Sequence, residues 1–274
     1  MLAALLWTQS GYMGALIKHR QPPIMTWGAV HYELNARYFK ELRYTDLYAC
    51  AIEADKEVNQ LYYANLRVRD LRTYREALIS DYEPCPKERF TEARWQQFVG
   101  DIRALWLAPT WMYGLFVEDP VLYWNSIIFD KGYNAPPPLI ALTRGMFWVF
   151  ERIGGSSFSR ALATLVDIGF MFAAVVAVYR HLGKRSALWL ALGFASYWAF
   201  TQALLGHIWQ HVWFASLVFM IVDIKRKRWR WAGWWLGFAT MTRVFPLFFL
   251  VPLVMRWWQT RTTPDHPDHA ATRH

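Results

Sequence analysis

The sequence predicts an all-α, polytopic helical membrane protein with a mostly helical extracytoplasmic N-terminal region. The 274 residues are 55% hydrophobic and 18% aromatic, and the apolar residues dominate between Ala161 and Met255, whereas the chain before about residue 100 is polar and charged. Basic residues form short clusters beside the apolar segments, a pattern that marks cytoplasmic helix ends in membrane proteins. These clusters are Arg180, Lys184 with Arg185, and Lys225 to Arg230.

Residues 1–20 form a candidate N-terminal membrane segment. Its apolar run, Met1 to Ile17, contains Thr8, Gln9 and Ser10 and is shorter than the roughly 20 residues that a membrane helix needs. The basic residues Lys18 to Arg20 follow this run, whereas a secretory signal carries its positive charge before the apolar core.

Residues 21–158 are expected to lie outside the cytoplasm. Apolar residues at intervals of three and four predict helices around Ala36 to Leu42, Leu66 to Leu71, and Ala93 to Leu105. The aromatic segment from Trp106 to Phe129 also carries charges, so we expect it to lie along the membrane surface. Cys50 and Cys85 both fall in this region, where a disulfide is permitted and two free thiols are the alternative.

A stiff turn separates this region from the spans, because residues 130–138 include Gly132 and three consecutive prolines. The apolar segment Leu139 to Phe150 has about 12 residues and contains Arg144, which favours an interfacial or re-entrant helix closed by Gly154 and Gly155.

Residues 159–258 are predicted to form the transmembrane bundle, followed by a disordered tail at residues 259–274. Three spans are expected, over Ala161 to Tyr179, Ser186 to Leu205, and residues 208–224. Asp167 lies within the first span and should face protein or water, with Arg144 as its expected partner. The last apolar block, from Trp231 to Met255, forms either one span or two half-helices broken at Arg243 and Pro246. Basic residues at both of its ends favour the broken hairpin.

Three short motifs occur in order along the chain: a Gly-Tyr-Asn-x-Pro-Pro turn, a Gly-His-x-x-Gln turn, and a longer Ala-Gly to Pro-Leu motif that contains Arg243. They occupy residues 132–137, 206–210 and 232–247. This series resembles the GT-C superfamily of membrane glycosyltransferases, particularly the polyprenyl-phosphate-mannose-dependent branch, and covers only the N-terminal half of such an enzyme. The family's catalytic Asp has no Asp counterpart here, and the family's membrane Gln and Asn correspond to His207 and Gln210.

The resemblance implies an outer carboxylate that acts as a general base and cations that hold the departing lipid phosphate. Glu33 and Asp130 are the predicted catalytic acids, chosen over Asp46 and Asp55. Arg243, with His207 and His211, is the predicted binding site for the lipid phosphate. The plainer alternatives are solvated surface carboxylates, an arginine that extends to the membrane surface, and histidines that are hydrogen-bonded within a bundle.

The predicted function is therefore the transfer of a sugar from a polyprenyl-phosphate carrier at the outer face of a bacterial cytoplasmic (inner) membrane. Its partners would be membrane lipid and the carrier sugar. The alternative is a non-catalytic subunit that binds other subunits of a membrane complex. The charge of +9 is not accompanied by a nucleic-acid-binding motif, and no nucleotide fingerprint or metal-ligand spacing suggests a cofactor or a metal.

Overall fold

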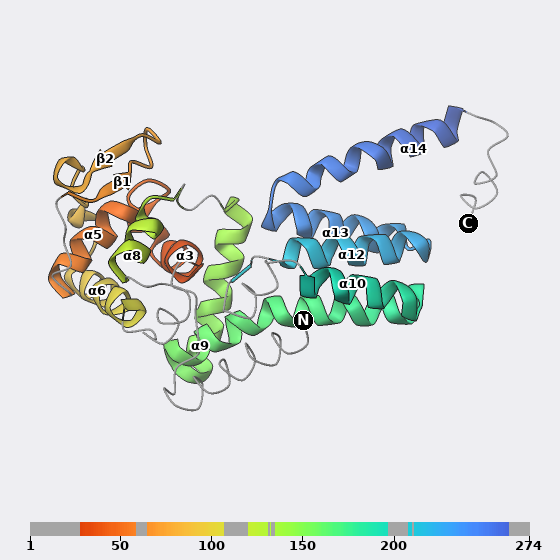
Figure 1. Ribbon diagram of the computed structural model, residues 1–274, viewed down its shortest axis with the longest axis horizontal. Coiled ribbons are helices and arrows are strands. Elements are labelled where there is room, and N and C mark those ends of the chain that lie inside the picture. Colours follow the sequence, from red (N-terminus) through yellow and green to blue (C-terminus); the bar gives the residue numbers. More distant parts are fainter. Residues whose placement is uncertain are drawn as a thin grey trace.

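The computed structural model describes residues 28–58, 65–106, 120–130, 132, 135–196, 208–209 and 211–262. It is mostly helical, as the sequence predicts. A compact N-terminal region lies at one end of an elongated molecule, and a bundle of long helices extends from it (Figure 1). The candidate membrane segment at residues 1–20 and the predicted site residue His207 lie outside the described residues.

The N-terminal region packs short helices around an aromatic core. Its elements are η1 (Ala29–Leu34), α3 (Asn35–Arg37), α4 (Phe39–Leu42), α5 (Leu47–Val58), β1 (Arg67–Arg69), β2 (Glu76–Leu78), η2 (Ile79–Asp81), η3 (Lys87–Arg89), α6 (Glu92–Trp106) and α8 (Pro120–Ile128). The predicted helix ending at Leu105 is confirmed as α6, which buries Trp95, Phe98 and Ile102. The Tyr38 and Phe98 rings meet edge to face, 4.9 Å apart.

One prediction for this region is wrong, and another falls largely outside the described residues. The segment around Leu66 to Leu71 contains the strand β1, which pairs with β2 in an antiparallel hairpin, and it is not a helix. Val68 is buried while its neighbours Arg67 and Arg69 are not, and this alternation of buried and exposed residues is typical of a strand. Of the predicted surface segment, Trp106 and residues 120–129 are described. In α8, Trp124, Ile127 and Ile128 are buried in the N-terminal core.

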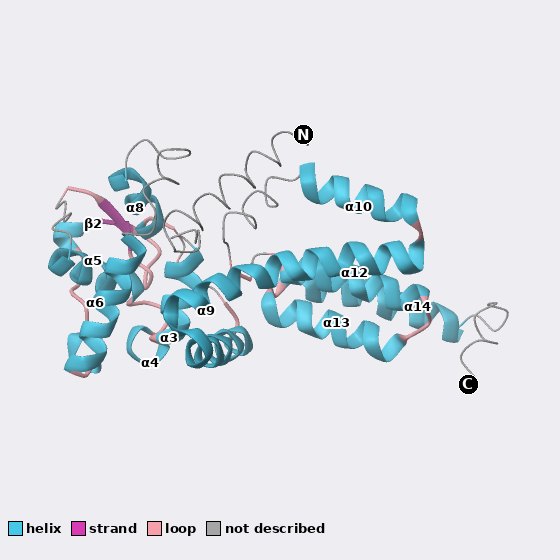
Figure 2. Ribbon diagram, turned by 90° about the horizontal axis from the view of Figure 1, so that it is seen from below, coloured by secondary structure: helices cyan, strands magenta, loops and turns pink. Residues whose placement is uncertain are grey.

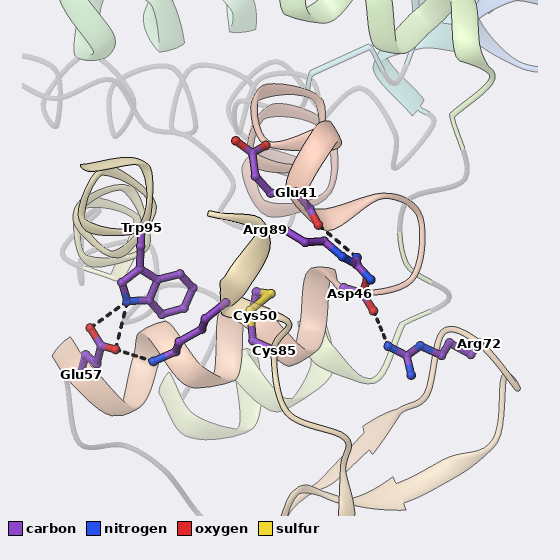
Figure 3. The surroundings of a disulfide bond; sticks show 9 residues. Glu41, Asp46, Cys50, Glu57, Arg72, Cys85, Arg89 and Trp95 are labelled. Carbon is purple, nitrogen blue, oxygen red and sulfur yellow. Dashed lines mark hydrogen bonds and ion pairs between the residues drawn. A yellow bond between two sulfur atoms is a disulfide. The ribbon is translucent and has the colours of Figure 1, made fainter. Parts of the chain in front are cut away.

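A disulfide joins Cys50 on α5 to Cys85 in the segment before η3. Figure 3 shows it between the contact of Trp95 with Glu57 on one side and the contacts of Asp46 with Arg72 and Arg89 on the other. The indole N–H of Trp95 donates to Glu57 at 3.0 Å, and Asp46 accepts from Arg72 at 2.8 Å and from Arg89. Of the two states that the sequence permits, the structure therefore has the disulfide.

The bundle begins with α9 (Pro137–Leu182), which bends at Gly155, where φ is +77°. Before the bend, α9 runs across the long axis of the molecule, and after it α9 runs along that axis (Figures 1 and 2). The helix predicted over Leu139 to Phe150 is therefore present as the first part of α9, and the non-helical backbone at Gly155 separates it from the first expected span. The sharp change of direction falls at the predicted glycine pair, where a positive φ suits a residue without Cβ.

The other bundle helices are α10 (Lys184–Ser196), α12 (Val212–Lys225), α13 (Trp229–Thr242), η4 (Phe245–Phe249) and α14 (Leu250–Thr262). They run up and down beside the second part of α9, so the three basic clusters lie at the same, outer end of the bundle (Figure 1). Of the two alternatives for the last apolar block, the structure shows the hairpin, because the chain reverses between α13 and α14. The tail prediction fails at its start, since α14 remains helical to Thr262.

Candidate functional site

The candidate site lies where the inner end of the bundle meets the N-terminal region. Arg243 occupies the break between α13 and η4, with an extended backbone (φ −148°, ψ 134°). The full length of α13 lies between Arg243 and the basic clusters (Figure 1). Pro246 follows in η4, where its missing N–H and fixed φ explain why α13 does not continue.

The guanidinium of Arg243 lies over the ring of Tyr32, 5.5 Å from its centroid. Tyr32 belongs to η1 and is only 3% exposed, packed in a cluster with Trp209 and Val212. Burial raises the pKa of the Tyr32 phenol, while the charge of Arg243 and a hydrogen bond with it oppose this rise. Tyr32 thus connects the N-terminal region to the break that carries Arg243.

Asp167 fixes the start of α12 beside this pair. Its Oδ1 accepts the backbone N–H groups of His211 and Val212, at 3.0 and 3.1 Å, so it caps the helix from a neighbouring element. The expected pairing with Arg144 is wrong, because Arg144 lies in a separate surface pocket and makes no ion pair with the described part of the chain.

The segment before α12 presents two buried nitrogen atoms without hydrogen-bond partners among the described residues, Trp209 Nε1 and His211 Nδ1. Trp209 also has a φ of +61°, a strained conformation for a residue with a Cβ. An indole N–H can only donate, so an acceptor such as an anion would satisfy it. Burial, and then the charge of Arg243, lowers the pKa of His211 to about 4, which keeps the imidazole neutral at pH 7.

Asp130 follows α8 and lies beside His31 of η1, whose Nε2 is 3.8 Å from Asp130 Oδ2. The same His31 nitrogen is 2.8 Å from the Tyr48 hydroxyl. The Asp130 side chain is 33% exposed, whereas Glu33, Asp46 and Asp55 are all buried. Of the four acids considered from the sequence, Asp130 is therefore the one that an acceptor molecule can reach without rearrangement.

Glu33 points into a different environment from its neighbour Tyr32. Its carboxylate accepts from Arg160 Nε at 2.8 and 3.0 Å and from Arg37 at 2.9 Å. Asp101 completes the cluster with contacts of 2.9 Å to Arg37 and 3.0 Å to Arg160. Burial raises the pKa of Glu33, and the two guanidinium groups oppose this rise. A carboxylate held in this way is an internal ion-pair partner and is poorly placed to act as a base.

The structure places these predicted residues differently. Arg243 lies over Tyr32, which packs with Trp209 and Val212 on either side of His211, and Asp130 lies 3.8 Å from His31, the residue before Tyr32. Glu33 lies in the ion-pair cluster. Tyr32 and Trp209 were not predicted as site residues, although Trp209 falls at an unspecified position of the motif at residues 206–210. Arg160 was also not predicted as a partner of Glu33. The other partner, Arg37, could have been predicted, because it lies four residues after Glu33 on a helix.

Neither the protein-family models nor the curated proteins nor the solved structures that were compared with the chain include a match. Within the described ranges, no group of three or more His, Cys, Asp or Glu side chains is arranged to hold a metal ion.

Proposed function

We propose that this chain is a GT-C-like glycosyltransferase, or a shortened relative, which transfers a sugar from a polyprenyl-phosphate carrier at the outer face of a bacterial cytoplasmic membrane. The observation that carries the proposal is the position of Arg243. It lies in a helix break far from the basic clusters and faces Tyr32. Tyr32 packs with Trp209, which together with His211 has a buried nitrogen without a hydrogen-bond partner among the described residues. Such a group of donors suits the charge of a phosphate.

The surface of the bundle supports a membrane location. Among the described residues, one helical segment, Leu165–Leu182, is long and apolar enough to cross a membrane. Within the described ranges, the exposed large apolar side chains other than Tyr44, Tyr74 and Leu78 all follow residue 147. An exposed apolar surface of this extent is typical of contact with lipid or with another protein. A multi-pass arrangement would place α10, α12, α13 and α14 in the membrane beside α9.

Aromatic side chains at the outer end of the bundle also fit a bilayer interface. Tyr179, Trp229, Trp231, Trp257 and Trp258 are each at least half exposed, and each lies within two residues of an arginine in the chain. Trp and Tyr favour the headgroup level, and arginine and lysine favour the cytoplasmic side. This end would face the cytoplasm, and the disulfide-containing region would lie outside, where disulfides persist.

In this proposal the acceptor hydroxyl attacks the anomeric carbon of the sugar, and its proton passes to the Asp130 carboxylate. The bond between the anomeric carbon and the phosphate oxygen breaks, and the phosphate leaves with the electron pair. Arg243 stabilises the negative charge that develops on this leaving group. Asp130 takes the base role in preference to Glu33, because its side chain is exposed and that of Glu33 is not.

The test is a transfer assay with the full chain purified in detergent and supplied with polyprenyl-phosphate sugars. Asp130→Asn and Arg243→Ala should each lower transfer by about 100-fold or more. Arg180→Ala is the matched control, since Arg180 is exposed at the other end of the bundle, and it should retain full activity. Absence of both transfer and carrier binding in the wild-type chain would refute the proposal.

One observation favours a second candidate, a subunit that binds partners in a membrane complex. Helix α14 is exposed along most of its length, with Phe248 just before it at 76% and Trp258 at 64%. A helix with so little internal packing could bind the helices of other subunits. Stable co-purification of such subunits, together with no transfer, would favour this candidate over the enzyme.

A further inference from the structure

A second feature, separate from the Tyr32 and Arg243 site, is a pocket of about 340 Å³ beside the first part of α9. Helices α3 and α4 form one side, α6 another, and α9 the third. None of its lining residues belongs to the proposed transfer site. They are Arg37, Lys40, Glu41, Arg94, Gln97, Arg144, Phe147, Trp148 and Glu151.

The lining has an excess of positive charge, with four cations and two carboxylates. Arg94 is paired with Glu41 at 3.0 Å, and Arg37 is paired within the ion-pair cluster and with Glu151. The side chains of Lys40 and Arg144 form no ion pair or hydrogen bond with any residue in the described ranges, and both residues are exposed. Two cations from different helices therefore remain available at one pocket.

Arg37 supplies a third unused donor. Its side chain is only 9% exposed, and both terminal nitrogens are engaged, yet Nε is buried without a hydrogen-bond partner among the described residues. A guanidinium stays protonated under all ordinary conditions, so this N–H needs an acceptor. A buried donor without an acceptor destabilises the fold, and a bound anion would satisfy it.

The remaining wall is aromatic. Phe147 is buried, and Trp148 is 55% exposed, with the Arg152 guanidinium 3.9 Å above its ring. This part of α9 runs across the bundle axis and exposes Val149 and Ile153 next to Trp148 (Figures 1 and 2). A helix that presents Trp, Arg and aliphatic side chains in this orientation has the character of an interfacial helix. An apolar wall beside cations fits a ligand that is anionic at one end and apolar at the other.

We propose that this pocket binds a phosphate ester, with Lys40 and Arg144 contacting the phosphate oxygens from α4 and α9 and Arg37 Nε completing the set. An anionic phospholipid headgroup and a soluble phosphate ester share this chemistry. The pocket is a binding site distinct from the catalytic one, so phosphate binding here does not depend on sugar transfer at Arg243.

The test uses the purified full chain in two comparisons. In the first, nanodiscs of phosphatidylcholine alone are compared with nanodiscs that also contain phosphatidylglycerol. In the second, the chain in detergent is compared with and without glycerol phosphate. Retained lipid is counted by native mass spectrometry, and the thermal unfolding midpoint is measured in each condition. We expect phosphatidylglycerol to be retained and to raise the midpoint. Lys40→Ala with Arg144→Ala should weaken this binding at least tenfold. Stabilisation by glycerol phosphate that depends on the same residues would assign the site to soluble phosphate esters.

Arg75→Ala with Arg103→Ala is the control, because it removes two exposed charges from the same region outside the pocket. This control should bind as the wild type does. Circular dichroism checks that the pocket variant remains folded, which its exposed substitution sites favour. The proposal is overturned if neither phosphatidylglycerol nor glycerol phosphate binds, or if the pocket variant and the wild type bind equally.

Discussion

Arg160 donates from Nε to both carboxylate oxygens of Glu33, at 2.8 and 3.0 Å, although the two residues are 127 positions apart in the chain. The contact joins η1 to α9 just after the bend at Gly155. Because Arg37 and Asp101 complete the same cluster, α6 is tied to the same point. The N-terminal region and the bundle are thus held together by buried charge as well as by apolar packing.

Arg160→Met should strongly destabilise the fold, because it leaves the buried Glu33 carboxylate with only one cationic partner. Breaking a buried ion pair by removing one partner costs about 3–5 kcal/mol. The thermal unfolding midpoint in detergent measures this loss. The double variant Arg160→Met with Glu33→Leu should recover much of it, and Arg180→Met, at an exposed position, should change little. An unchanged midpoint in Arg160→Met would show that the ion pair does not stabilise the fold.

Local patterns predicted the elements that depend on local packing. The spacing of Trp95, Phe98 and Ile102 correctly indicated α6, and the charge pattern around Trp231 to Met255 favoured the hairpin that breaks at Arg243. These features were predictable because periodicity and proline act within a few residues. The hairpin of β1 and β2 was missed because each strand has only three residues, which is too short for alternation to outweigh apparent helical spacing.

The contacts of the candidate site were less predictable, since they join residues far apart in the chain. Nothing near Glu33 indicates that Arg160 neutralises it, so the sequence ranked it with Asp130 as an accessible acid. Similarly, Asp167 caps α12 through backbone N–H groups, a contact that periodicity does not reveal. Arg243 was identified because a charge within an apolar block stands out by itself.

The disulfide should contribute substantially to the stability of the N-terminal region. Cys50 and Cys85 are separated by 35 positions. Closing a loop of this size lowers the conformational entropy of the unfolded chain, which stabilises the folded state by about 4 kcal/mol in the loop-entropy model. Cys50→Ser with Cys85→Ser should therefore lower the unfolding midpoint, and a reductant should lower it in the wild type but not in this variant. A reductant that has no effect on the wild type, together with two thiols that react freely, would contradict the disulfide.

Gly132→Ala should destabilise the turn after α8. Gly132 has a φ of +74°, and a Cβ there would lie 2.6 Å from Leu71 Cδ2, so the substitution combines backbone strain with a clash. We expect a loss of about 1–3 kcal/mol, measured by thermal or denaturant unfolding. Gly145→Ala is the matched control, because a Cβ at that helical position meets no atom within 4 Å. It should be neutral or stabilising, and equal losses in both variants would contradict this account.

His211 predicts a dependence of stability on pH. Its pKa in the folded chain is lowered to about 4, from an ordinary value of 6.5, because burial and Arg243 disfavour the imidazolium. As the pH falls below about 6.5, the unfolded chain takes up a proton that the folded chain binds only near pH 4. Stability should fall over this interval, by at most about 3 kcal/mol. His211→Gln should reduce the slope of the midpoint against pH, whereas His181→Gln, at an exposed position, should leave the slope as in the wild type.

The placement of the basic clusters at one end of the bundle predicts a membrane topology that can be measured in cells. Glu88 is exposed in the disulfide-containing region, whereas Lys184 and Arg230 are exposed at the basic end. Because Cys50 and Cys85 are bonded to each other, a single introduced cysteine is the only reactive thiol. An impermeant maleimide should label Glu88→Cys in intact cells with a permeabilised outer envelope. It should label Lys184→Cys and Arg230→Cys only after the inner membrane is opened. Labelling of all three positions in intact cells would show that the bundle does not span the membrane. The reverse pattern would show an inverted orientation, and Asp130 would then lie on the wrong side for a polyprenyl-phosphate donor at the outer face.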